Sequence, residues 1–274
     1  VVDDYEMGIT HVVRGEDHIS NTPKQMMIYN ALGWAVPVFA HLPIILGEDR
    51  SKLSKRHGAK SVSEYKSNGF LSHALINYLS LLGWSPPEGK ELLSLTELFE
   101  LFDISRINKA GAVFDTVKLT WMNKQYLSQL DNQMFLDHVR LFISSANQQL
   151  DSLDAKVISV RDNLETLSRI NHYLEVYTLT TDQFLQKFSD LKVNDIEQDV
   201  LREARQFLVD NDGWSIDKVK ALIEHVMTTL SLGRGKVMKP LRKGFTGYES
   251  GPNLVDCLAL IPKQEILNRL DRVI

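Results

Sequence analysis

A short basic run with a hydroxyl at its centre is the segment with the clearest chemical potential. It covers residues 52–58, with lysines at Lys52 and Lys55, Ser54 between them and a glycine at its end. Two lysines three residues apart beside a glycine are suited to a mobile loop that brings ammonium groups to a polyphosphate. A lysine ammonium is a compact charge, and it can stabilise the negative charge that phosphoryl oxygens gain as pyrophosphate leaves. Taken alone, the pattern also fits a solvated basic turn.

The residues before this run predict a strand, a helix and a second strand. Residues 9–14 and 39–46 are rich in β-branched and apolar side chains, which is typical of strands, and the second is the more buried candidate. Between them, Asn21 or Thr22 can cap a helix that Gly33 can end. This order is what a unit with a parallel sheet needs, so we expect the last part of an α/β domain here.

The rest of the chain predicts helices. Residues 60–130 contain helix-start signals, such as the capping box of Ser94 and Glu97 and the potential cap at Asp115. From residue 131 onward we find only helical patterns. The clearest apolar stripe follows the spacing i, i+3, i+4, i+7, i+8 and i+11, and it consists of Val219, Leu222, Ile223, Val226, Met227 and Leu230. The expected fold is therefore mainly α with a small α/β part.

Composition and charge exclude several classes of protein. The 274 residues are 43% hydrophobic and 24% charged, as in ordinary globular proteins, and no apolar run is long enough to predict a membrane span. The single cysteine, Cys257, rules out an intramolecular disulfide, favours a reducing cytoplasmic setting and is expected to pack in the core. The eight histidines lack the spacing of a zinc site. The first residues show no secretory signal and no initiator methionine, which favours a start inside a longer protein.

A second basic stretch stands out because the chain as a whole has a net charge of −4. Residues 231–245 contain no acid, and with Gly233, Gly235, Pro240 and Gly244 they predict a loop. Such a loop can contact a phosphate backbone, although it can also serve only as a solvated connection. Its basic residues are Arg234, Lys236, Lys239, Arg242 and Lys243.

Residues 52–56 resemble the KMSKS loop of class I aminoacyl-tRNA synthetases, with Leu53 in place of the methionine and Arg56 in place of the final serine. Other segments, in the same order, resemble the bacterial type of glutamyl-tRNA synthetase from the second half of its catalytic domain onward. They cover nearly the whole chain and include the residues at 1–18, 20–23, 39–43, 46–47, 77–79, 82–85, 112–115, 119, 121–123, 235–236 and 240–242. Several motifs in the right order are far more specific than any one of them.

The resemblance implies a division of the chain and a reaction. Residues 1–59 would be the remainder of a Rossmann-type catalytic domain, and residues 60–130 a helical domain that contacts the tRNA acceptor stem. Two helical anticodon-binding subdomains would follow at 131–196 and 197–274. The implied enzyme is a glutamate–tRNA ligase, a cytoplasmic monomer that uses ATP with Mg²⁺ and contains no zinc in this part. Its partners would be glutamate, ATP and tRNA(Glu), and whether tRNA(Gln) is also charged stays open.

The resemblance also assigns roles to individual residues. Arg14 would hold the carboxylate of glutamate, and a guanidinium fork suits a planar carboxylate. Lys52 and Lys55 would be catalytic, with Lys55 the better candidate for contact with pyrophosphate. The residues at the ATP site would be Asp17, His18, Ile44, Ile45, Lys52, Ser54 and Lys55. Contact with tRNA would come from the basic residues of 231–245. Without the resemblance, Arg14 reads as a surface or salt-bridged residue, and Ile44 and Ile45 as core.

Class I synthetases carry a second signature, close to His-Ile-Gly-His, which does not occur in this sequence. Half a nucleotide site cannot position two reactants, so we expect the chain alone not to form glutamyl-adenylate. Three alternatives stay open. The chain could come from a glutaminyl or eukaryotic-type enzyme, although their β-barrel anticodon domains disagree with the helical pattern after residue 131. It could also be a short tRNA-modifying paralogue, or a tRNA-binding or regulatory module without catalysis.

Overall fold

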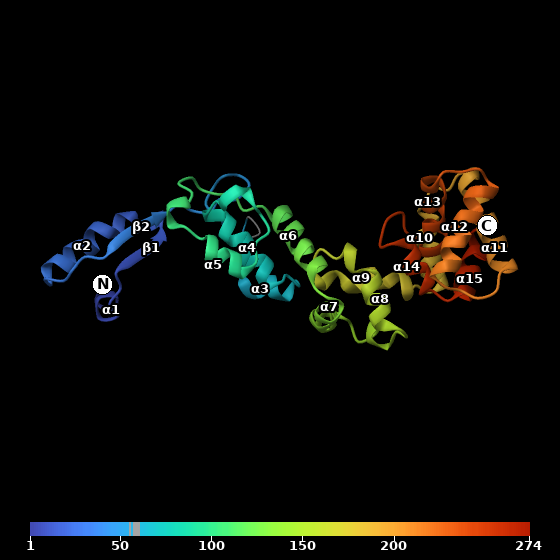
Figure 1. Ribbon diagram of the computed structural model, residues 1–274, viewed down its shortest axis with the longest axis horizontal. Helices are drawn as coiled ribbons and strands as arrows, with labels where there is room; N and C mark the ends of the chain where they lie inside the picture. The colour runs from blue at the N-terminus through green and yellow to red at the C-terminus, as the bar shows by residue number, and fades with distance from the viewer. Residues whose placement is uncertain (55, 57–60) are drawn as a thin grey trace. The chain divides into compact units, whose positions relative to one another are not determined.

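The computed structural model describes residues 1–54, 56 and 61–274, which form two compact units, Val1–Tyr126 and Leu127–Ile274. Helices dominate both units, and the described residues contain one sheet, of two strands (Figure 1). The predicted fold class, mainly α with a small α/β part, is confirmed. The finer division of the chain at residues 59, 130 and 196 stays a prediction.

The first unit begins with the expected strand, helix and strand. The strands β1 (His11–Gly15) and β2 (Val38–Leu42) are parallel, and Arg14 lies opposite His41 in their register. They are joined through a 3-10 turn, η1 (Glu16–Asn21), and helix α2 (Thr22–Ala31), as Figure 1 shows. A short helix, α1 (Val2–Glu6), precedes them.

The expected cap of helix α2 is wrong. Within the described residues, neither Asn21 nor Thr22 makes a side-chain capping bond to this helix. The hydroxyl of Thr22 instead lies 3.0 Å from the ring of His41 on β2, and it accepts a hydrogen bond from Arg14. The end of the helix is as expected, because Gly33 adopts a φ of +69°, which glycine reaches without steric cost.

The β1-α2-β2 segment buries little of its own apolar surface. Within residues 1–54, Tyr29 is the one large apolar side chain that is fully buried. Both faces of a parallel sheet are normally covered in proteins, so this exposure is unusual. The exposed apolar side chains of the segment are Val2, Tyr5, Met7, Ile9, Val13, Ile19, Met26, Met27, Ile28, Leu32, Val38 and Ile45.

The rest of the first unit is helical and has its own core. Its elements are α3 (Val62–Ser67), α4 (Ser72–Gly83), η3 (Pro87–Gly89), α5 (Leu95–Leu101), η4 (Ile104–Arg106) and α6 (Thr116–Gln129). Tyr78 and Phe114 meet edge to face in the core, with ring centroids 5.2 Å apart. The capping box of Ser94 and Glu97 is confirmed, and the carboxylate of Asp115 caps α6 by accepting from the Lys118 amide.

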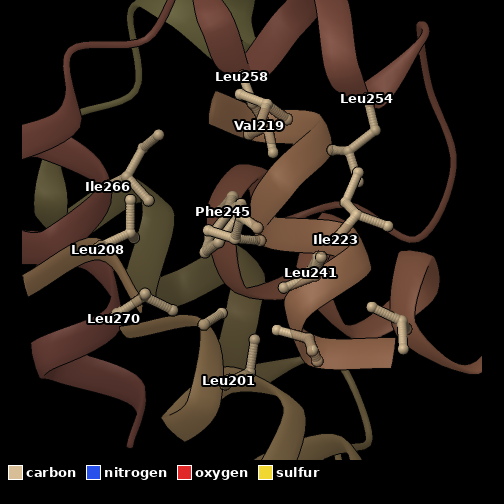
Figure 2. Packing of buried hydrophobic residues seen from close by; sticks show 14 of the residues in the cluster. Leu201, Leu208, Val219, Ile223, Leu241, Phe245, Leu254, Leu258, Ile266 and Leu270 are labelled. Atoms are coloured by element: carbon tan, nitrogen blue, oxygen red, sulfur yellow. The ribbon is translucent and has the colours of Figure 1, made fainter. Parts of the chain in front are cut away.

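The second unit is a helical assembly around a large apolar core. Its helices are α7 (Asn132–Val139), α8 (Leu153–Ser159), α9 (Ile170–Leu174), α10 (Thr181–Ser189), α11 (Asp195–Asp210), α12 (Ile216–Thr229), α13 (Arg234–Thr246), α14 (Leu254–Ala259) and α15 (Lys263–Val273). Short 3-10 turns lie at Arg140–Phe142, Asn147–Gln149, Arg161–Asn163, Leu167–Arg169 and Glu175–Tyr177. Figure 2 shows side chains from α11 to α15 directed into this core, with Phe245 of α13 near its middle. The stripe predicted at residues 219–230 forms one wall of it.

The loop predicted at residues 231–245 is wrong, because most of this stretch is the helix α13. Val237, Leu241 and Phe245 are four residues apart and fully buried, so they form one apolar stripe. Burying each of them contributes about 1.5–3 kcal/mol. The three together outweigh the roughly 3 kcal/mol by which Pro240 disfavours a helix interior.

Gly244 lets α13 approach α11 closely. A Cβ atom at Gly244 would lie 2.4 Å from Cδ2 of Leu201, which is itself fully buried on α11. Such a distance is a steric overlap, so any side chain at this position would force the buried Leu201 side chain to move. The residue that helped to predict a loop is therefore an adaptation to helix packing.

Three further expectations concern what the chain contains. Cys257 is 1% exposed and lies in the interior of the second unit, as predicted. Within the described ranges, no group of three or more metal-ligating side chains gathers at one place. Among the same residues, no helix is both long and apolar enough to span a bilayer.

Candidate active site

Lys52 lies at the edge of a small β-ladder. Leu46 bridges to Lys52 in antiparallel fashion on one side and to Val113 in parallel fashion on the other. The amide of Leu53 donates to the carbonyl of Ile45 at 2.9 Å, which closes the turn between them. The backbone on both sides of this turn is therefore hydrogen-bonded, and it fixes where the lysine run begins. Lys55 and residues 57–60 lie outside the described residues.

An ion pair ties the start of this run to the end of β1. The ammonium of Lys52 donates to Oδ2 of Asp17 at 2.8 Å, and both side chains are largely exposed. The hydrogen bond from Lys52 lowers the pKa of the Asp17 carboxyl below its usual range, against a smaller opposing effect of desolvation. Two of the seven residues that the resemblance assigns to the ATP site are thus brought together.

Arg14, near the carboxyl end of β1, is surrounded by polar side chains. Its Nη2 donates to Thr22 Oγ1 at 2.8 Å and to Gln25 Oε1 at 2.6 Å. Its Nε lies 3.4 Å from Nε2 of His41, and its Cζ lies 5.3 Å from the centre of the Phe39 ring. A guanidinium beside an aromatic ring and bonded at two nitrogens has a defined orientation. The alternative reading of Arg14 as a salt-bridged residue is not supported, because no carboxylate among the described residues pairs with it.

The other residues assigned to ATP lie close to these groups along the chain. His18 lies on η1, where its Nδ1 is 3.3 Å from the side-chain amide nitrogen (Nδ2) of Asn21. Ile44 donates its backbone N–H to Glu16 at 3.1 Å, and Ile45 keeps 37% of its surface exposed. A Cβ at Gly111 would come within 2.8 Å of the Ile44 carbonyl oxygen, so the first unit packs tightly there.

Sequence reasoning did not predict the contacts that hold this site together. Thr22, Gln25 and His41 contact Arg14, and Glu16 holds the backbone of Ile44. The one usable signal was His41, a polar residue inside an apolar strand. The others come from turns and a helix surface, where polar side chains are common and carry no signal by themselves.

The basic residues of 231–245 fall into two groups. Arg234, Lys236 and Lys239 are exposed on the first half of α13. Lys243 is only 3% exposed, and its ammonium donates to the carbonyl of Lys192 at 2.7 Å and to Glu197 at 3.0 Å.

Arg242 also belongs to the fold. It donates to the Pro252 carbonyl at 2.7 Å, and burial lowers the pKa of its guanidinium. The second half of α13 therefore uses its charges to hold the second unit together.

Comparison with known proteins gives two adjoining family matches. The family "tRNA synthetases class I (E and Q), catalytic domain" matches residues 1–121. The family "Anticodon binding domain" matches residues 119–274, which is more than half of the chain. The change from one family to the other falls close to the boundary between the two units, after Tyr126.

Individual relatives agree over the whole chain. It is 41% identical over 281 residues to a glutamate–tRNA ligase of Aquifex aeolicus and 37% identical to one of Thermodesulfovibrio yellowstonii, and both matches cover 100% of the chain. A solved glutamate–tRNA synthetase of Elizabethkingia anophelis superimposes with a TM-score of 0.81 at 30% identity. A glutamate tRNA ligase of Elizabethkingia meningosepticum gives 0.78 at 29%. The chain spans 59% of the length of the Aquifex relative and 58% of each solved chain.

Proposed function

Because the chain belongs to the glutamate–tRNA ligase family of class I tRNA synthetases, we propose that it acts within an enzyme that joins glutamate to tRNA(Glu) with ATP. The observation that carries this proposal is the grouping at the end of β1. Arg14, the proposed glutamate ligand, is followed three residues later by Asp17, which binds Lys52 of the lysine run. The family resemblance also supports a cytoplasmic, monomeric enzyme.

The proposed reaction has two steps. A carboxylate oxygen of glutamate attacks the α-phosphorus of ATP, and the bond to pyrophosphate breaks, which gives glutamyl-adenylate. A terminal ribose hydroxyl of tRNA then attacks the acyl carbon, and AMP leaves. Arg14 would orient the substrate, while Lys52 and Lys55 would stabilise the charge on the phosphates, with Mg²⁺ entering as part of the ATP substrate. Asp17, His18, Ile44, Ile45 and Ser54 would form the nucleotide side of the site.

Lys52 must change partner in this scheme. In the structure its ammonium is paired with Asp17, and a polyphosphate would compete for the same charge. Both side chains are largely exposed, so the ion pair is weak and exchanging Asp17 for a phosphate costs little. The pair therefore holds the lysine near the site and leaves it available.

We propose that the second unit binds tRNA through the exposed half of α13. Arg234, Lys236 and Lys239 are accessible to phosphates there, whereas Arg242 and Lys243 are engaged in the interior. The first three residues are therefore the ones we propose for direct contact with tRNA phosphates, while Arg242 and Lys243 already donate to carbonyls of the protein.

We further propose that this chain alone binds tRNA but does not activate glutamate. Its sequence carries the lysine run and lacks a His-Ile-Gly-His type of signature, so one side of the ATP site is not supplied. Glutamate-dependent exchange of pyrophosphate into ATP tests this. We expect no exchange from the chain alone. A full-length ligase that contains this chain should catalyse the exchange, and Arg14→Ala in that ligase should abolish it. Exchange by the chain alone would refute the proposed division of the site. Normal exchange by the Arg14→Ala ligase would refute the role of Arg14.

A further inference from the structure

The guanidinium of Arg14 has an imidazole as one of its neighbours. Arg14 and His41 face each other in the register of β1 and β2. Arg14 Nε donates to His41 Nε2 at 3.4 Å. We propose that His41 is a positioning residue, which fixes the orientation of the Arg14 guanidinium toward a substrate carboxylate. This inference rests on the proposed role of Arg14 in glutamate binding and names the residue that makes it effective.

The hydrogen-bond geometry defines the state of the histidine ring. Every N–H of an arginine is a donor, so His41 Nε2 must present a lone pair to Arg14 Nε. The neutral ring then carries its proton on Nδ1. The hydroxyl of Thr22 lies 3.0 Å from the same Nε2, and it donates to the carbonyl of His18 at 3.3 Å. Its oxygen accepts from Arg14 Nη2 at 2.8 Å, which closes a cycle of three side chains.

Other neighbours limit the movement of the guanidinium. Gln25 Oε1 accepts from Nη2 at 2.6 Å. Phe39, two residues before His41 on β2, lies beside the guanidinium, and the rings of Phe39 and His41 are nearly parallel, 6.4 Å apart. The strand β2 thus offers Arg14 an aromatic surface and an acceptor from alternate positions on one face.

The same contacts define which part of Arg14 is free. Nε and Nη2 are engaged by the protein, while Nη1 has no hydrogen-bond partner in the part of the chain that the structure describes. Nη1 is therefore the donor available to a carboxylate, and its direction depends on the anchored nitrogens. A ligand of the other nitrogens would have to displace His41, Thr22 or Gln25.

Two substitutions distinguish the contribution of the His41 hydrogen-bond acceptor from that of its aromatic ring. His41→Phe keeps an aromatic side chain and removes the acceptor, whereas His41→Gln offers an amide oxygen at a similar distance from the backbone. The change His73→Phe is a matched control, because His73 is exposed on α4. Thermal unfolding of each variant shows whether the fold is kept.

The first readout is independent of catalysis. The Arg14 Nε–H of the chain is observed by nitrogen-15 NMR, and its exchange with water is measured. We expect slow exchange in the parent chain, in His41→Gln and in His73→Phe, and exchange faster by about tenfold or more in His41→Phe, because one charge-assisted hydrogen bond is removed. Unchanged exchange in a folded His41→Phe chain would overturn the positioning role.

The second readout is the KM for glutamate in a full-length ligase that contains this chain. His41→Phe should raise this KM about tenfold with a much smaller change in kcat, and His41→Gln should restore most of it. If Nε–H exchange accelerates while the KM for glutamate is unchanged, His41 does orient Arg14, and the proposed role of Arg14 in glutamate binding is refuted instead. If both change together, positioning and function are both supported.

Discussion

Lys52 donates a hydrogen bond to the carboxylate of Asp17 at 2.8 Å, although the two residues are 35 positions apart in the sequence. One end of this ion pair belongs to the turn that follows β1, and the other to the short ladder formed by residues 45–53. The ion pair therefore joins two proposed nucleotide-binding residues, one of which follows the proposed glutamate ligand Arg14 by three positions. Because both side chains are exposed, its importance is in placement rather than in stability.

The first prediction concerns the titration of Asp17. Its pKa is lowered in the folded chain, so the carboxylate stays charged and paired above its ordinary value of 3.8, and the ion pair breaks as pH falls through the lower folded value. Lys52→Ala should move the pKa of Asp17 back upward. Carboxyl carbon-13 NMR across a pH series measures this shift, with Asp17→Asn used to assign the resonance. An identical midpoint with and without Lys52 would contradict the ion pair.

The second prediction concerns the close approach of α11 and α13. Gly244→Ala should lower the free energy of unfolding by about 1–3 kcal/mol, because the new methyl group overlaps the buried side chain of Leu201. Gly235→Ala on the same helix is the control. In the described part of the chain nothing lies within 4 Å of its added Cβ, so this change should be neutral or stabilising by up to about 1 kcal/mol.

Urea unfolding of the two glycine variants and of Gly244→Ala combined with Leu201→Ala measures these values. The second change removes the atoms that clash, so the cost of Gly244→Ala should be smaller in that background. Equal costs in both backgrounds would show that contact with Leu201 is not the reason for glycine.

The third prediction separates the two groups of basic residues on α13 by stability. Lys243→Met should destabilise the chain by roughly 3 kcal/mol, since it leaves Glu197, 13% exposed, without its cation. Lys239→Met is the control. Lys239 is exposed, so its replacement should change the free energy of unfolding by less than about 0.5 kcal/mol. Chemical unfolding measures the free energy of unfolding of both variants, and equal values would contradict the interior placement of Lys243.

The fourth prediction applies to tRNA binding at several salt concentrations. Removing Lys236 or Lys239 should weaken binding to every tRNA to a similar degree and reduce the slope of log K against log salt by about 1 for each phosphate that the variant no longer neutralises. Alanine at Lys24, which is exposed on α2 in the first unit, is the matched control and should leave the slope unchanged. An unaltered slope in the α13 variants would exclude this surface as the one that binds phosphates.

Local patterns predicted much of the fold. The stripe of α12, the capping box at Ser94 and the strand–helix–strand order depend on residues that are close in sequence, and they were found where expected. The helix α13 was missed for a physical reason. Gly244 and Pro240 favour a loop locally, and only the packing against Leu201, more than forty residues away, explains the glycine.

The candidate site was less predictable. The resemblance pointed to Arg14, Asp17 and Lys52, and the structure brings Asp17 and Lys52 together in an ion pair. Nothing local indicated that His41 would lie opposite Arg14, because this follows from the register of two strands. In the same way, the interior position of Lys243 depends on Glu197, 46 positions earlier. Long-range interactions of this kind leave no periodic pattern in a single sequence.

The most direct test of the account is the binding of this chain to an unmodified glutamate tRNA and to an unrelated tRNA, across a series of salt concentrations. We predict tighter binding to the glutamate tRNA, which weakens with salt and keeps its preference at moderate salt, as expected for an interface that reads more than the phosphate backbone. Equal and weak binding to both tRNAs at every salt concentration would contradict the claim that residues 127–274 form a working anticodon-binding unit.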